Sequence, residues 1–280
     1  MRFFARHFFP YTCAFIFLFL LASCVSLPKV QSQEEEDALF APDTYIPQKF
    51  EWLPVTEGIE RFDFLKDSVA YTVVKINLKQ TELDLVPYPN KKESGARQVQ
   101  DFAMEHGCTI AFNTLPFTGD IPPKLMGVHY AEGIFYSSCI ERYSSLLFYT
   151  QDDGSLRAKI SETQDEAEVL NADFAFGGFF AVLVKGQVQE FKHFSYEARL
   201  GAGLSADGGT LFIMLVRSGG AFHGLSYPQC ARIFLAMGCT DALEFDGGHS
   251  AELFVKDQSI RGTSLTRKQA AMLGFKKRSL

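Results

Sequence analysis

The chain has 280 residues, a formal net charge of −6 at neutral pH, and 47% hydrophobic residues, which is enough apolar material for a sizeable folded core. An acidic chain without a basic stripe cannot neutralise the phosphates of a nucleic acid, so its composition argues against a nucleic-acid partner.

The first 24 residues have the three parts of an export signal: Arg2 and Arg6, an apolar run over residues 13–22, and small residues before Cys24. The apolar run is shorter than the roughly 20 residues that a membrane-spanning helix needs. The sequence LASC resembles a bacterial lipobox, which implies a signal peptide over residues 1–23 and lipid on the Cys24 sulfur. The alternative is an ordinary cleaved signal with an incidental cysteine. We expect an exported protein, anchored by lipid to a bacterial membrane on its periplasmic or outer-surface side.

Residues 24–49 are polar and acidic, which is typical of a solvated, flexible tether. Residues 50–280 contain no second low-complexity break and are expected to form one domain. Beyond the first 24 residues the chain has four cysteines, which are either buried free thiols or paired in an exported protein. These are Cys108, Cys139, Cys230 and Cys239.

The first half of the domain begins with two alternating, β-branched segments, residues 69–78 and 81–88, which predict a hairpin. Residues 97–106 have a helical pattern that stops at Gly107, and residues 109–112 form a short apolar strand that ends at Asn113.

The second half predicts two further hairpins, over residues 180–191 and 200–216, the latter turning at Asp207-Gly208. Residues 226–238 predict a helix, because Ser226 and Gln229 have the spacing of a capping box. The fold class expected is α+β, a strand-rich mixed or antiparallel sheet with flanking helices.

Residues 102–113 and 234–246 share one pattern: helix, Gly, Cys, Thr, short strand, and then a polar residue at the end of the strand. The two terminal residues are Asn113 and Asp246. Polar groups at strand ends are common positions for sites on a rigid scaffold, so we expect these two residues to face one cleft.

The segment LEFDGGHSAELF, residues 243–254, carries the main candidate chemistry. Strand alternation predicts Glu244 and Asp246 on one face, where paired carboxylates suit general acid–base catalysis or, if a cation is present, Ca²⁺. Gly247 and Gly248 allow backbone N–H groups to approach an anion closely. The alternative interpretations are a solvent-facing Glu244 and a tight turn at Asp246.

Arg199, His223 and His249 are further candidates. A guanidinium binds phosphate well, and histidines near a glycine-rich loop exchange protons near neutral pH, although each is also common as a structural residue. A nucleophile elbow, a P-loop and an H-E-x-x-H helix are all missing from the sequence, which argues against the reactions they perform.

The linear order of residues 197–256 resembles the phosphodiester glycosidase family. The most specific part is Gly-Cys-Thr-Asp-Ala-Leu at 238–243 leading into Asp246-Gly247-Gly248, and the resemblance extends weakly to AFNTLPF and FAFGGFFAVLVKGQV upstream. By position it implies that five residues line a glycosyl-phosphate site: Asn113, Arg199, Asp246, Gly247 and Gly248.

Several positions depart from the family pattern, in which Asn stands at the position of Glu244 and a third glycine at that of His249. The departures touch each loop that approaches substrate: Leu200, Thr114 to Pro116, Arg217 to Gly219, Glu244, His249 and Ala251.

The resemblance implies a hydrolase acting on a sugar-1-phosphodiester or related glycosidic bond of envelope or environmental glycans. In that hypothesis Arg199 and the loop N–H groups hold phosphate, with His223 nearby, and Asp246 acts with Glu244 or His249 in acid–base or nucleophilic roles. The ligand is then a carbohydrate or sugar phosphate. The alternative is a non-catalytic envelope lipoprotein that binds a glycan or a protein partner through an altered cleft.

Overall fold

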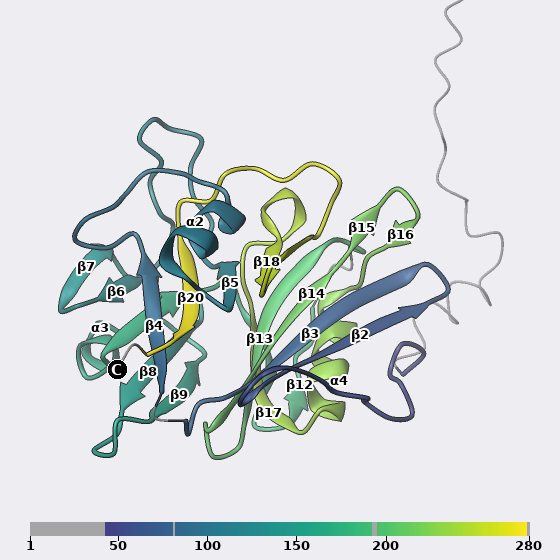
Figure 1. The fold of residues 1–280 in the computed structure, drawn as a ribbon. Helices are drawn as coiled ribbons and strands as arrows, with labels where there is room; N and C mark the ends of the chain where they lie inside the picture. The colour runs from purple at the N-terminus through teal and green to yellow at the C-terminus, as the bar shows by residue number, and fades with distance from the viewer. Residues whose placement is uncertain (1–42, 81, 192–194, 279–280) are drawn as a thin grey trace, which may run out of the picture. The chain divides into compact units, whose positions relative to one another are not determined.

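The structure, a computed structural model, describes residues 43–80, 82–191 and 195–278 (Figure 1). The predicted signal peptide, the lipidation site at Cys24 and most of the predicted tether lie outside these residues. Tyr45 falls within the tether prediction, yet it is buried, and its carbonyl accepts a hydrogen bond from the Tyr71 hydroxyl at 2.9 Å. The packed unit therefore begins before Phe50.

Antiparallel strands make up three larger sheets and one short ribbon (Figure 1). The largest has the spatial order β1 (Leu53–Thr56), β2 (Ile59–Lys66), β3 (Val69–Asn77), β14 (Thr210–Val216), β13 (Arg199–Ser205), β17 (Cys239–Glu244), β11 (Ala181–Val184) and β12 (Gln187–Val188). The second is β19 (Gln258–Arg261), β18 (Glu252–Val255), β5 (Ile110–Asn113), β20 (Met272–Lys277) and β4 (Leu83–Tyr88). The third is β7 (Ile134–Ser137), β6 (His129–Ala131), β10 (Phe174–Gly177), β8 (Ser145–Thr150) and β9 (Leu156–Ser161), and the ribbon is β15 (Ser218–Gly219) with β16 (Phe222–His223).

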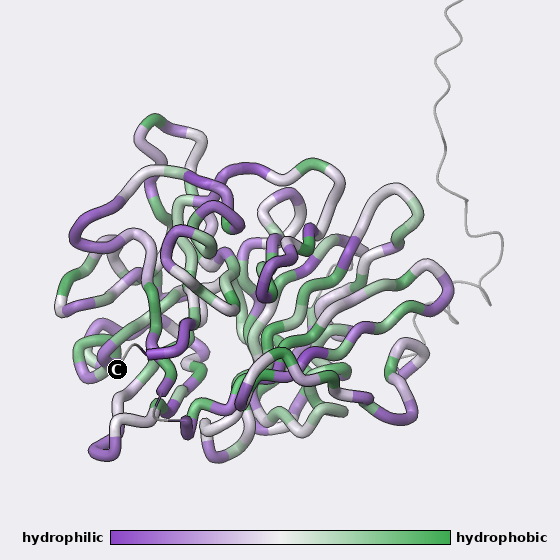
Figure 2. The backbone as a smooth tube through the Cα atoms, viewed as in Figure 1, coloured by the Kyte–Doolittle hydropathy of each residue, from purple (hydrophilic) through white to green (hydrophobic). Residues whose placement is uncertain are grey.

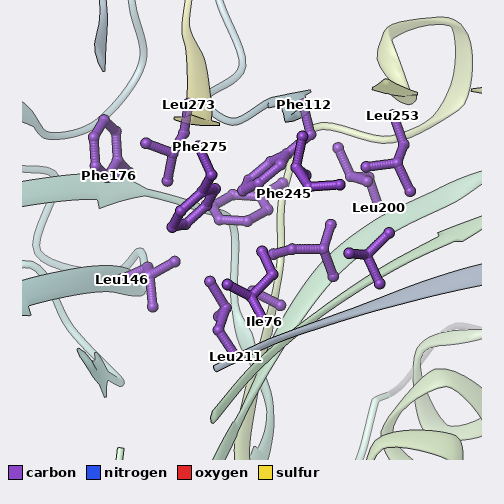
Figure 3. Packing of buried hydrophobic residues seen from close by; sticks show 14 of the residues in the cluster. Ile76, Phe112, Leu146, Phe176, Leu200, Leu211, Phe245, Leu253, Leu273 and Phe275 are labelled. Atoms are coloured by element: carbon purple, nitrogen blue, oxygen red, sulfur yellow. The ribbon is translucent and has the colours of Figure 1, made fainter. Parts of the chain in front are cut away.

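The main core lies where the inner faces of the three larger sheets meet. Side chains on β14 alternate between two clusters: Leu211, Ile213 and Leu215 join the main core, whereas Phe212 and Met214 point to the opposite face. Figure 3 shows the inner-face residues, with Phe112, Phe245 and Phe275 gathered at the centre. In Figure 2 hydrophobic colour follows the middle of the long strands and hydrophilic colour gathers in many of the connections.

In the part of the chain that the structure describes, three short α-helices cover the outer faces of the sheets. Helix α4 (Tyr227–Ala236) packs on the largest sheet, α2 (Val99–His106) on the second and α3 (Glu166–Leu170) beside the third. Among the described residues, no helix is long and apolar enough to cross a membrane. The predicted α+β class is confirmed, and the strand pairings are antiparallel throughout the described sheets.

Most of the predicted local elements are present. The capping box at the start of α4, the end of α2 at Gly107 with a φ of 66°, and both hairpins in the second half are confirmed. The hairpin predicted over residues 69–88 is wrong, because β3 pairs with β2 and β14 whereas β4 pairs with β20 in a different sheet. The four cysteines of the domain are free thiols.

Candidate functional site

Asp246 lies two residues after the end of β17, next to the core residue Phe245, and is 8% exposed. Its Oδ2 accepts a hydrogen bond from Nη2 of Arg267 at 2.7 Å. The same guanidinium donates from Nε to Ser250 Oγ at 2.6 Å, and its central carbon lies 4.3 Å from the ring centroid of Phe117. A carboxylate, a hydroxyl and a half-exposed guanidinium stacked on an aromatic ring therefore form one compact cluster.

Burial raises the pKa of Asp246 above its ordinary value, and hydrogen bonds from Ser250 and Arg267 oppose that rise. A carboxyl group whose pKa is moved towards neutrality exchanges protons more effectively at physiological pH than an ordinary aspartate.

Asn113 joins the end of β17 to the second sheet. Its Nδ2 donates to the Asp246 carbonyl at 2.8 Å, and its Oδ1 accepts from the Glu252 N–H at 3.0 Å. The Asp246 N–H donates to the Thr114 carbonyl at 2.8 Å. The two strand ends thus meet as predicted. The Asn113 amide is fully buried, however, and both its oxygen and its nitrogen are used within the fold, so this residue positions Asp246 and does not contact substrate directly.

The predicted role of Gly248 as an anion ligand needs correction, whereas that of Gly247 stays a prediction. The Gly248 N–H donates to the Ala198 carbonyl at 2.8 Å, and a Cβ on Gly247 would lie 2.7 Å from that same oxygen. Gly248 also has a φ of 57°, which favours glycine. The glycines are therefore needed for the close approach of this loop to β13.

Arg199 is not placed to hold a phosphate. It is 6% exposed, and its guanidinium donates to the Leu225 carbonyl at 3.0 Å and to the carbonyl and hydroxyl of Ser195 at 2.6 and 2.9 Å. Its central carbon lies 3.9 Å from the Tyr227 ring centroid. Because the guanidinium is buried and these internal acceptors occupy its Nε and Nη2, the prediction that Arg199 binds phosphate is corrected to a structural role.

Glu244 lies beneath helix α4 and is 1% exposed. Burial raises its pKa to about 8, despite the opposing effects of the Arg199 charge and the nearby Cys230 thiol. Glu244 and Asp246 do not form the predicted pair, because they have different neighbours. Glu244 is sealed beside Cys230 and Arg199, whereas Asp246 contacts Arg267 at 2.7 Å.

The predicted Ca²⁺ ligands do not fit a cation. Glu244 is 1% exposed and lies beside the Arg199 charge and the Cys230 thiol, and Asp246 already faces the positive charge of Arg267. A calcium site needs several oxygen ligands that converge on one point, and these two carboxyls have different neighbours.

His249 and His223 are both exposed. His249 lies in the 3-10 turn Gly248–Ser250 and contributes its carbonyl to the Arg267 N–H at 3.1 Å. His223 is in β16, where its N–H donates to the Ser68 carbonyl at 2.9 Å. His249 therefore lies in the turn that follows Asp246, whereas His223 lies on the β15–β16 ribbon.

Arg267 and Ser250 are the site residues that sequence reasoning missed. Arg267 is 21 residues beyond Asp246, in the connection between β19 and β20, and no local pattern marks it. Ser250 lies within the GGHS segment, but the sequence does not show that its hydroxyl contacts Asp246. That hydrogen bond opposes the rise in the Asp246 pKa that burial causes.

Comparison with known proteins places this geometry in context. A family model described as phosphodiester glycosidase matches residues 106–276. The catalytic domain of zebrafish N-acetylglucosamine-1-phosphodiester alpha-N-acetylglucosaminidase, auto-inhibited by its pro-peptide, is 16% identical with a TM-score of 0.63, and the match covers 82% of this chain and 88% of that one. No curated protein matches the chain.

Two other crystal structures share the fold. A hypothetical protein from Synechocystis is 13% identical with a TM-score of 0.63, over 82% of this chain and 64% of that one, so the chain spans less than two thirds of that protein. A protein of Burkholderia pseudomallei, whose description predicts that it is exported, is 13% identical with a TM-score of 0.56, over 74% of each chain.

Proposed function

Because the chain belongs to the phosphodiester glycosidase family, we propose that it hydrolyses a sugar-1-phosphodiester. In this reaction water replaces the phosphate at the anomeric carbon. The products are a free sugar and a phosphomonoester. The observation that carries the proposal is the buried Asp246 carboxyl held against Arg267 and Ser250 at the end of β17.

Asp246 and Arg267 suit two different parts of this reaction. A carboxyl group with a raised pKa assists the attack on the anomeric carbon, as a base towards water or as a direct nucleophile. Arg267 is half exposed and has further N–H donors beyond the two that contact Ser250 and Asp246, so it stabilises negative charge on the departing phosphate.

A single carboxyl group is sufficient for this chemistry. Ordinary glycosidases use a second carboxylic acid to protonate a poor, alcohol-like leaving group. A phosphate leaves as a weakly basic anion whose second pKa is about 6, so charge stabilisation replaces protonation. This explains how the site operates while Glu244 is sealed beneath α4.

The test is the release of free reducing sugar from a panel of alkyl esters of sugar-1-phosphates, using the full chain in detergent. Cleavage at the anomeric carbon leaves the alcohol on the phosphate, so the free sugar is the product that reports the reaction. Asp246→Asn removes the titrating group and is expected to lower kcat about 10²- to 10⁴-fold. Asp257→Asn, at an exposed position in the β18–β19 turn, is the matched control and is expected to retain wild-type turnover. Equal kcat in wild type and Asp246→Asn, with both folded by melting temperature, removes Asp246 from the mechanism.

A non-catalytic binding protein is the second candidate. It is favoured by the way Arg267 and Phe117 cover the Asp246 carboxyl, because a covered carboxyl has limited access to a sugar. Saturable binding of the same esters by wild type, without turnover of any of them, would support this candidate.

We further propose that the chain is exported and anchored through lipid on Cys24. The positive start, the short apolar run and the LASC sequence support this proposal. In a bacterial host, radiolabelled palmitate is expected to label the wild type, and Cys24→Ser is expected to lose the label. Cys13→Ser, within the predicted signal, is the control that retains it. Label in the Cys24→Ser variant would contradict the anchor.

A further inference from the structure

An open cleft of about 640 Å³ lies beside the site without including Asp246 or Arg267. Its walls come from β2 and β3, from the β15–β16 ribbon, and from β19 with the residues that follow it. In Figure 1 the ribbon stands next to β14, near the loop that leaves β18 and β19. The proposed reaction does not use this cleft.

The cleft is positively charged although the protein is acidic. Three arginines line it, Arg61, Arg217 and Arg261, together with a single carboxylate, Asp63, so its local charge is two positive units in a chain of net charge −6. Asp63 is neutralised by Arg61, whose Nε lies 2.7 Å from Oδ2.

The other two arginines are available to a ligand. Arg217 and Arg261 are exposed, and among the described residues no carboxylate forms an ion pair with either of them. The central carbon of Arg217 lies 3.9 Å from the ring centroid of Phe222, so the guanidinium packs against this ring. A fixed, planar guanidinium is well suited to bidentate binding of a phosphate.

The floor of the cleft connects directly to the Asp246 loop. The Ser218 N–H donates to the Gly262 carbonyl at 2.7 Å, and the Gly262 N–H donates to the Ala251 carbonyl at 2.8 Å. Ala251 follows the 3-10 turn that carries Ser250. Residues 262–264 line the cleft, and Arg267 contacts Asp246 three residues later, so one short segment serves both places.

We propose that this cleft binds a second phosphate of the substrate, which is therefore a carbohydrate or polyol chain with repeated phosphodiesters. This inference rests on the proposed function for the position of the bond that is cleaved. The first phosphate lies at Arg267, and the next one along the chain is held by Arg217 and Arg261. The aromatic ring of Phe222 and the exposed groups of the ribbon face the intervening polyol.

The test measures binding of a synthetic tetramer of glycerol phosphate to the full chain in detergent by titration calorimetry. Uncharged tetraglycerol is the ligand control. Wild type is expected to bind the charged tetramer, with an affinity that falls as salt rises, and to bind tetraglycerol at least tenfold more weakly. Equal affinity for the two ligands would overturn the charge-based proposal.

The variant Arg217→Gln with Arg261→Gln is expected to raise the Kd for the charged tetramer at least tenfold. The variant with lysine at both positions keeps the charge but loses the planar guanidinium. Its Kd for the charged tetramer is expected to lie between those of wild type and of the double glutamine variant. Arg142→Gln is the matched control: Arg142 is also exposed and stacked on a ring, 5.0 Å from the Tyr143 centroid, but lies outside the cleft, so the Kd is expected to stay unchanged. A double glutamine variant that melts like wild type and binds with the wild-type Kd would overturn the proposal.

The source of the phosphate and the proposed reaction are tested separately. Mixed micelles of the detergent with phosphatidylglycerol that displace the tetramer at equal phosphate concentration would reassign the cleft to lipid headgroups and overturn the carbohydrate assignment. Failure of the proposed reaction is read from the sugar-1-phosphate esters, none of which would release free sugar in the presence of wild type. Arginine-dependent binding of the tetramer in that case would still support the cleft.

Discussion

Glu244 and Asp246 are two residues apart, yet Glu244 is sealed beneath helix α4 and Asp246 faces the guanidinium of Arg267. β17 ends at Glu244, and the backbone turns at Asp246, where the carbonyl and N–H bond to Asn113 and Thr114. Burial without a strong hydrogen-bond partner leaves Glu244 protonated near neutral pH, since its pKa is about 8. The result is two carboxyls in different environments, one within the core and one beside a half-exposed guanidinium.

The buried Glu244 makes the stability of the fold depend on pH. Its pKa is raised from 4.5 to about 8, so between these values the unfolded chain releases a proton that the folded chain retains. The free energy of unfolding therefore falls as pH rises through this window, by at most about 1.4 kcal/mol per pH unit. Below pH 4.5 the full stabilisation is present, and above about pH 8 it has been lost.

Glu244→Gln is expected to remove this dependence, because glutamine has no titrating proton. Urea unfolding at several values between about pH 5 and about pH 8 is expected to show wild type losing stability relative to the variant as pH rises. Glu190→Gln, at an exposed carboxylate, is expected to keep the wild-type slope. Parallel profiles for wild type and Glu244→Gln would show that Glu244 is ionised in the folded state.

Residue-level prediction from sequence succeeded where the residue and its partner are joined by a visible pattern. The meeting of Asn113 with Asp246 was predicted because two segments share one pattern that ends at these residues. Arg267 was missed because its role arises only when the β19–β20 connection folds back over Phe117. Arg199 was misassigned because a sequence does not reveal that Ser195 and Leu225 occupy its donors.

At the scale of elements, helix α4 lies close to the largest sheet because two positions on β13 lack side chains. A Cβ on Gly203 would lie 2.5 Å from the Phe234 ring and 2.7 Å from Cys239 Sγ, and one on Gly201 would lie 2.8 Å from the Leu243 carbonyl. Phe234 and Cys239 are both buried, so the space between helix and sheet is already filled.

Gly203→Ala is expected to lower the free energy of unfolding by about 1 to 3 kcal/mol, because the added methyl group pushes Phe234 away from the sheet. Gly119→Ala is the matched control. A Cβ there meets no atom within 4 Å, so its effect is expected to stay below about 0.5 kcal/mol. Chemical denaturation measures both, and equal stability of the two variants would contradict close helix packing.

The elements predicted best are those whose signals are local. The start of α4 was found because Gln229 accepts from the Ser226 N–H only three residues away, and the β13–β14 hairpin was found from its Asp-Gly turn. The pairing of β3 with β4 was wrong because adjacency in the chain is only a tendency, and β4 instead joins β20, near the C-terminus.

At the scale of the whole domain, the sheets meet in one core, and the candidate chemistry lies at the edge where they join. Three strands meet around Asn113. β17 of the largest sheet and β5 of the second sheet end there, and β18 of the second sheet begins there. The fold class followed from the strand patterns, and the resemblance noticed in residues 197–256 lies within the match over residues 106–276. The order of the strands in each sheet depends on long-range packing that the strand patterns do not encode.

The hydrogen bonds of Asn113 restrict where this protein adapts to its ligand. The segment from Asp246 to Glu252 is tied at both ends to one buried amide, so its length and path are fixed. One rim of the site is therefore rigid. We expect ligands of different shape to be accommodated instead by the connections that carry Phe117 and Arg267, which pack on each other. Substrate preference in proteins built on this plan is expected to change through the length and composition of those two connections, while the rigid rim stays the same.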